Sequence, residues 1–149
     1  MSVKETLESA LKQAMRDKDE MKRNSLRLAL STLKLAEVDA GKPLDDLAVF
    51  AILQKEIKTK EETLAEALKA GRDAMAQSMQ VEINFLKEFL PKELSEAELA
   101  EIVKAAINET GAVSIKDMGR VMKIAMEKVA GRAPNDRISK LVRDILPAQ

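Results

Sequence analysis

The sequence predicts an all-α protein, and three observations carry this prediction. The chain has only five glycines and four prolines, and most of them stand where helices should end. Runs of β-branched residues and strict alternation of apolar and polar residues, the marks of strands, are missing. Apolar residues instead recur at steps of three and four, the spacing that lines one face of a helix. We therefore expect an N-terminal antiparallel bundle of about four helices, followed by a three-helix domain.

Four helices are expected between the N-terminus and Pro91. The first ends around residues 17–19, the second spans about residues 20–40, the third spans about residues 45–70, and the fourth runs to Leu90. The first opens with the capping-box pattern Ser2-x-x-Glu5, whose side chains satisfy free backbone amides at a helix start. Gly41 suits the left-handed conformation that closes the second helix.

The second helix carries apolar residues on two faces rather than one. Leu26 and Leu33 belong to one face, whereas Met21, Leu28 and Leu35 belong to the other. Since a helix with two apolar faces usually lies between neighbours, we expect it to occupy the centre of the bundle.

Three shorter helices are expected after Pro91, each with one apolar stripe, as a three-helix bundle requires. Their expected starts are the capping patterns Ser95-x-x-Glu98 and Ser114-x-x-Asp117, and then Asn135 or Asp136. We place the boundary at the short joint after Pro91, which gives two domains, residues 1–92 and 93–149.

The composition excludes several kinds of active site. The chain has no Cys and no His, which removes thiolate and imidazole zinc sites and every mechanism that needs either side chain. It also has no G-x-x-x-x-G-K-[ST] nucleotide loop and no G-x-S-x-G nucleophile elbow. We expect no catalytic residue, no metal and no cofactor, and interpret the chain as non-catalytic by itself.

The sequence also gives an expectation for location. No apolar segment approaches the ~18 residues of a membrane-spanning helix, and the first residues carry charges instead of the apolar run of a signal peptide. We therefore expect a cytoplasmic protein that does not contact a membrane.

The charges balance overall, 25 basic against 25 acidic, but they are uneven along the chain. Residues 91–110 hold two basic and five acidic residues, whereas residues 111–149 hold eight basic and four acidic ones. The basic end is either an ordinary solvated surface or a surface that binds RNA phosphates; the overall balance argues against DNA as a partner. The candidate RNA-binding residues are Lys116, Arg120, Lys123, Lys128, Arg132, Arg137 and Lys140.

A second basic stripe lies on the second helix, between its two apolar faces. It consists of Arg23, Arg27 and Lys34. We favour pairing with acidic residues of neighbouring helices, or extension into solvent, over contact with RNA.

Stacking on unpaired bases is not expected. The three aromatic residues are Phe50, Phe85 and Phe89. Each lies on or near an apolar stripe, and there is no Tyr or Trp to extend a stacking platform. Without stacking residues, a helical protein would recognise folded RNA by its shape and phosphate positions.

Three segments spread over the chain form a set of motifs. They are Ala70-Gly71-Arg72, Phe89-Leu90-Pro91-x-x-Leu94-Ser95-x-x-x-Leu99, and Asp117-Met118-Gly119-x-Val121-Met122 with Gly131-Arg132-Ala133. Together they resemble the YqeY family, a freestanding relative of the tail of GatB, a subunit of the tRNA-dependent amidotransferase. In one place the chain departs from the family, which usually has Asp-Gly where this chain has Pro134-Asn135.

The resemblance implies an N-terminal helical bundle and a C-terminal three-helix YqeY domain. In GatB the corresponding tail helps to hold tRNA while other domains carry out catalysis. By analogy, this chain would bind tRNA or accompany an amidotransferase. The alternative is an adaptor that docks on a tRNA synthetase or an amidotransferase. The family label of carbon–nitrogen ligase with glutamine as donor is not carried over, because no active-site motif supports it.

Gly119 is unusual because it lies inside a predicted helix. We favour close packing of two helices as its role, with close approach of the backbone to a phosphate as the alternative.

Overall fold

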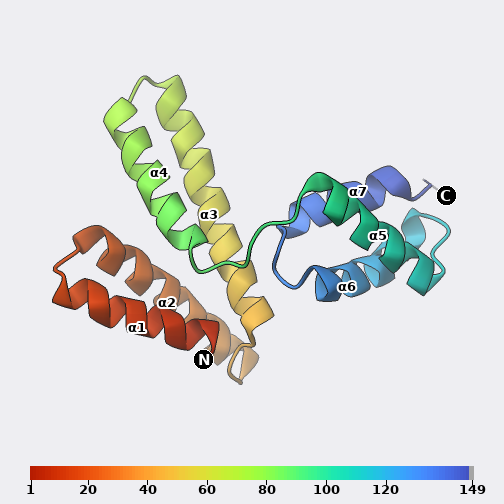
Figure 1. Ribbon diagram of the computed structural model, residues 1–149, viewed down its shortest axis with the longest axis horizontal. Coiled ribbons are helices and arrows are strands. Elements are labelled where there is room, and N and C mark those ends of the chain that lie inside the picture. The colour runs from red at the N-terminus through yellow and green to blue at the C-terminus, as the bar shows by residue number, and fades with distance from the viewer. Residues whose placement is uncertain (148–149) are drawn as a thin grey trace. The chain divides into compact units, whose positions relative to one another are not determined.

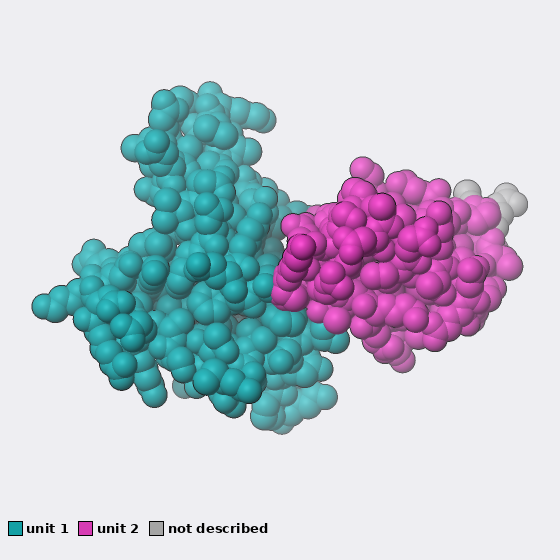
Figure 2. Space-filling model, in the orientation of Figure 1, with its two compact units in different colours: residues 1–90 teal, residues 91–149 magenta. Residues whose placement is uncertain are grey.

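The chain is all-helical, as predicted. Residues 1–147, which the computed structural model describes, form seven α-helices and one short 3₁₀ helix, with no strand among them (Figure 1). In chain order these are α1 (Val3–Arg16), α2 (Glu20–Ala40), α3 (Asp46–Lys69), α4 (Asp73–Lys87), α5 (Glu96–Thr110), η1 (Ile115–Asp117), α6 (Met118–Val129) and α7 (Asn135–Ile145). They form two compact units, Met1–Leu90 and Pro91–Gln149 (Figure 2).

The N-terminal unit consists of two helical hairpins, α1–α2 and α3–α4 (Figure 1). Its core is aliphatic, with Leu7, Leu26 and Leu53 fully buried. The aromatic ring of Phe85 packs edge-to-face on Phe89, with the ring centroids 5.3 Å apart. The core of this unit is therefore mainly aliphatic, and of the aromatic residues Phe85 is buried in it and Phe89 packs against it.

The C-terminal unit is a three-helix bundle in which each helix buries one stripe. Val103 of α5, Val121 of α6, and Ile138 and Val142 of α7 are all buried in one core. The capping box that opens α5 is complete: the Glu98 amide donates to Ser95 Oγ (3.2 Å), and the Ser95 amide donates to Glu98 Oε1 (3.1 Å). These local signals place α5 where the sequence predicts it.

Two helix ends differ from the prediction. The residues from Ser114 form η1, and α6 begins only at Met118. The capping box predicted at Ser114 is incomplete, because Ser114 Oγ accepts the amide of Lys116 (3.3 Å) while the amide of Asp117 donates to the Ser114 carbonyl (3.0 Å). Helix α4 ends at Lys87 rather than at residue 90. The residue before Pro91 is disfavoured in the helical conformation, so the chain leaves the helix early.

Helix α2 packs against all three other helices of its unit, as its predicted central position requires, but it does not bury both of its apolar faces. Leu26 and Leu33 are buried in the core, but Leu28 and Leu35 on the other face are 54% and 67% exposed. The four helices form two hairpins, and α2 contacts α1, α3 and α4. Leu28 and Leu35 of the second apolar face are therefore left in solvent, whereas Met21 packs against the core.

Candidate nucleic-acid interface

The acidic segment of the C-terminal unit neutralises part of its basic end. The ammonium of Lys128 on α6 lies 3.0 Å from Glu109 Oε2 on α5. The guanidinium of Arg137 on α7 lies 2.6 Å from Glu93 Oε1 and 2.8 Å from Glu96 Oε1. Two stretches of opposite net charge, separate in the sequence, thus become neighbours in the fold.

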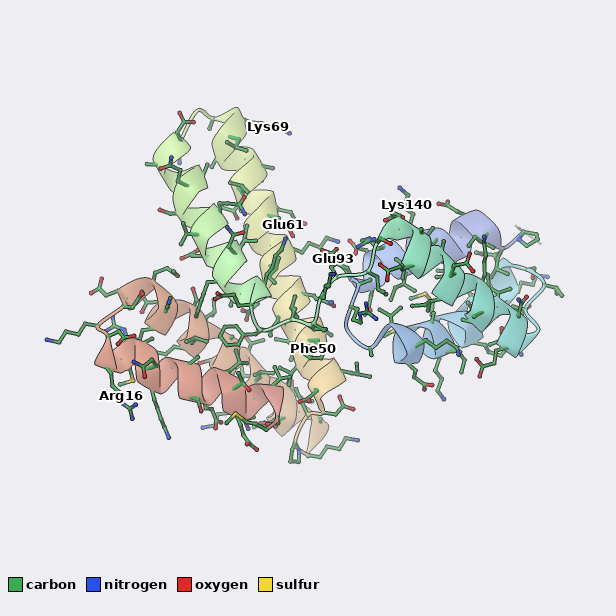
Figure 3. The ribbon with its side chains drawn as sticks, viewed as in Figure 1. Arg16, Phe50, Glu61, Lys69, Glu93 and Lys140 are labelled. Carbon is green, nitrogen blue, oxygen red and sulfur yellow. The ribbon has the colours of Figure 1, made fainter. Side chains whose placement is uncertain are left out.

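Arg132 and Arg137 hold the segment that leads into α5. Arg132 Nε donates to the Lys92 carbonyl (3.2 Å), and the Leu94 amide donates to the Arg132 carbonyl (2.8 Å). Arg137 also donates to the Leu94 carbonyl (3.3 Å) and to Glu93, which is labelled in Figure 3. These two predicted RNA-binding residues therefore have structural partners. Part of the family motif around Leu94 and Arg132 has the same structural role.

Arg120 is exposed but ion-paired. Its guanidinium lies 2.7 Å from Asp117 Oδ1 and donates to the Thr110 carbonyl (3.3 Å). The amide of Val113, and after it the Arg120 guanidinium, lower the pKa of Asp117 by hydrogen bonding to its carboxylate. The Asp117 charge is therefore well stabilised, and Arg120 is only partly available to a ligand.

Three predicted residues remain available: Lys116 on η1, Lys123 on α6 and Lys140 on α7. All three are exposed, and their ammonium groups form no hydrogen bond or ion pair with another residue of the described chain. Lys116 and Lys123 follow one another along η1 and α6, roughly two turns apart. Lys140 belongs to a different helix (Figure 3). The structure thus places two lysines along one stretch and one lysine apart from them.

Gly119 lies in the first turn of α6, and the structure contradicts close helix packing as its role. A Cβ added there would meet no atom within 4 Å, and the residue is exposed and helical. At about 100° per residue it lies roughly 40° around the helix from Lys123. Gly119 therefore presents bare backbone to solvent beside an unpaired lysine.

The basic stripe of α2 forms no ion pair with a neighbouring helix among the described residues. Arg23 has only a 3.9 Å contact with Glu20 of its own helix. Arg27 and Lys34 are exposed, and their side chains form no ion pair within residues 1–147. Their charges extend into solvent, which is the second of the two arrangements favoured from the sequence.

Glu56 on α3 is a half-buried residue whose carboxylate lacks a donor within the described residues. Both of its oxygens are inaccessible to solvent and have no hydrogen-bond partner. Burial raises the pKa of Glu56, and the nearby Thr32 hydroxyl and Lys60 ammonium oppose this shift only in part. A single carboxylate forms neither an acid–base pair nor a ligand set.

Over residues 1–147, no three acidic, His or Cys side chains gather in a way that could hold a metal ion. In the same range no helix combines the length and the apolar character needed to cross a bilayer.

The comparison with known families agrees with the motifs. The family model described as Yqey-like protein matches residues 4–146 of the chain. The chain belongs to the YqeY family. The resemblance inferred from the three motifs is thereby confirmed, and the match spans both compact units.

Several relatives of this YqeY-family chain carry the name "Altered inheritance of mitochondria protein 41, mitochondrial". One from Pyrenophora tritici-repentis is 28% identical over 149 residues, which cover 96% of this chain and 80% of the relative. One from Lachancea thermotolerans is 32% identical over 132 residues, covering 87% of this chain and 70% of the relative. One from Eremothecium gossypii is 36% identical over 85 residues, covering 56% and 46%.

These names correct the expected cytoplasmic location, which is wrong by this comparison. The relatives are named as mitochondrial proteins. The expectation rested on the lack of a long apolar segment and of an apolar run in the first residues, and neither feature distinguishes the cytoplasm from a mitochondrial compartment.

Proposed function

We propose that this YqeY-family chain is a non-catalytic accessory protein that binds tRNA. The observation that carries the proposal is the pair of exposed lysines, Lys116 and Lys123, on either side of the bare backbone of Gly119. The resemblance of the chain to the tail of GatB, which helps to hold tRNA, supports the same ligand.

The chemistry of these residues suits a phosphate backbone. Neither lysine has an internal ion pair, so a phosphate contact does not require an existing one to break. The missing side chain at Gly119 lets a sugar–phosphate strand approach the helix closely. Such contacts position an RNA without selecting its bases, which agrees with the absence of Tyr and Trp from the sequence.

The remaining predicted residues fit this role less well. A phosphate bound by Arg137 would compete with Glu93 and Glu96, and one bound by Lys128 would compete with Glu109. Lys140 forms no ion pair in the described chain, and we assign it a separate contact from α7.

The experiment is a titration of total tRNA by fluorescence anisotropy across a series of salt concentrations. Lys123→Gln should weaken binding and flatten the slope of log affinity against log salt by about 0.7–0.9, the effect of one lost phosphate contact. Lys128→Gln is the matched control on the same helix, and it should leave the slope nearly unchanged because Glu109 already holds that charge.

Two results would overturn the proposal. One is the absence of tRNA binding even at low salt. The other is binding whose affinity and salt slope do not respond to Lys116→Gln or Lys123→Gln. In either case, recovery of a tRNA synthetase or an amidotransferase after nuclease treatment would support the adaptor alternative instead.

A further inference from the structure

The exposed face of α2 carries a coiled-coil pattern. Leu28, Ser31, Leu35 and Val38 recur at alternating steps of three and four, which is the a and d spacing of a heptad repeat. Leu28 is 54%, Leu35 67% and Val38 70% exposed. At about 100° per residue these positions lie opposite the buried Leu33. We call these four residues the α2 stripe.

The heptad spacing of the α2 stripe is typical of a helix that packs against another helix. Single exposed leucines are ordinary on a protein surface, but aligned apolar side chains at heptad spacing are not. A stripe at this spacing matches the knobs-into-holes surface of a second helix, whereas the α1, α3 and α4 helices of the same unit leave it in solvent.

The charges beside the α2 stripe favour one particular partner. Arg27 and Lys34 occupy the g positions on one edge, and Asp39 occupies an e position on the other. All three are exposed, and their side chains make no ion pair with another described residue. If a second α2 lies parallel and in register, Lys34 of each copy faces Asp39 of the other. If it lies antiparallel, the two basic edges face each other and repel.

We propose that α2 pairs with α2 of a second copy of this chain, parallel and in register, to form a twofold-symmetric dimer. Symmetry doubles the Lys34–Asp39 pair and places each residue of the α2 stripe against its own equivalent. The α2 stripe is much smaller than the roughly 800 Å² that each partner buries in a standard interface. The dimer is therefore reversible, and its population rises with protein concentration.

Sedimentation equilibrium over a concentration series tests the surface. Leu35→Glu should raise the dimer dissociation constant at least about tenfold, because it buries a carboxylate in the seam. Val113→Glu is the control, since Val113 is an equally exposed apolar residue (74%) in the other unit. Far-UV circular dichroism shows whether either variant has lost helix. A chain that stays monomeric throughout, or a dimer that Leu35→Glu does not weaken, overturns the proposal and leaves the stripe to a different protein.

A charge swap tests the parallel orientation. Lys34→Glu alone and Asp39→Lys alone should each weaken the dimer, and the two together should restore it. Strengthening by Lys34→Glu alone would overturn the parallel arrangement, because only an antiparallel pair gains from it. The chain contains no Cys, so Val38→Cys adds one reactive thiol at a d position. Oxidation should cross-link it in the parallel dimer. Absence of a cross-link at concentrations where the dimer is populated counts against the arrangement.

Discussion

The two units of the chain use amphipathic helices in different ways. In the C-terminal unit each of three helices buries one stripe, and acidic and basic segments pair across the bundle. In the N-terminal unit α2 buries one apolar face and exposes another, and its Arg27 and Lys34 have no partners there. The contrast shows where to look for binding surfaces. Binding surfaces are marked by apolar side chains that stay exposed and charged side chains that stay unpaired within their own unit. The total charge of a segment does not mark them.

The largest expected effect compares the two faces of α2. Leu33→Ala should lower the free energy of unfolding by about 3 kcal/mol, because Leu33 is 1% exposed and truncation leaves a cavity. Leu35→Ala should change it by less than about 0.5 kcal/mol, because Leu35 is 67% exposed. The measurement is urea unfolding followed by circular dichroism, since the chain has no Trp to report by fluorescence.

These two variants are each other's control, since they differ only in the face that they occupy. Both should be measured at low protein concentration, so that self-association does not contribute to the apparent stability. Equal losses from Leu33→Ala and Leu35→Ala would mean that the second face is covered within the chain, and the contrast between the units would disappear.

The next effect compares two cations of α7. Arg137→Gln should lower the free energy of unfolding by about 1–2 kcal/mol. The substitution removes charge-assisted hydrogen bonds to Glu93 and Glu96 and a hydrogen bond to the Leu94 carbonyl. Lys140→Gln should change the free energy of unfolding by less than about 0.5 kcal/mol, because the Lys140 ammonium forms no ion pair in the described chain. The same urea unfolding experiment checks both. If neither variant changes the free energy of unfolding, the ion pairs of Arg137 are too exposed to solvent to stabilise the segment that leads into α5.

A smaller effect concerns the buried carboxylate of the N-terminal unit. The folded-state pKa of Glu56 is raised by burial, so ionisation opposes folding. The free energy of unfolding therefore falls as pH rises from the ordinary carboxyl range through this raised pKa. Glu56→Gln should stabilise the chain by about 1 kcal/mol at neutral pH, at the low end of the cost of a buried group without a partner.

The pH dependence separates this explanation from a packing effect. The advantage of Glu56→Gln should vanish at about pH 4 and below, where the native carboxyl is protonated as well. Unfolding curves at the two pH values give the comparison. A gain that persists at low pH would show that improved packing, rather than removal of a buried charge, stabilises the variant.

Features set by nearby residues could be predicted from the sequence, and features set by tertiary packing could not. The capping box at Ser95 and the left-handed Gly41 depend on residues within one turn, and both were predicted. The exposure of Leu28 depends on how two hairpins pack, which the periodicity of α2 does not contain. The pairing of Arg137 with Glu93 joins residues 44 positions apart. The number of unpaired basic side chains on the C-terminal unit is therefore smaller than the net charge of residues 111–149 predicts.

The smallest expected effect concerns Gly119, and it tests the proposed binding surface of the C-terminal unit. Because an added Cβ would meet no atom within 4 Å and the backbone is already helical, Gly119→Ala should raise the stability of the C-terminal unit by roughly 0.5 kcal/mol. If the bare backbone serves close approach of a phosphate strand, the same variant should weaken tRNA binding while Lys116 and Lys123 remain in place. Urea unfolding and anisotropy titration measure the two effects separately. Tighter or unchanged tRNA binding by the stabilised variant would remove Gly119 from the interface and leave the lysines alone to carry it.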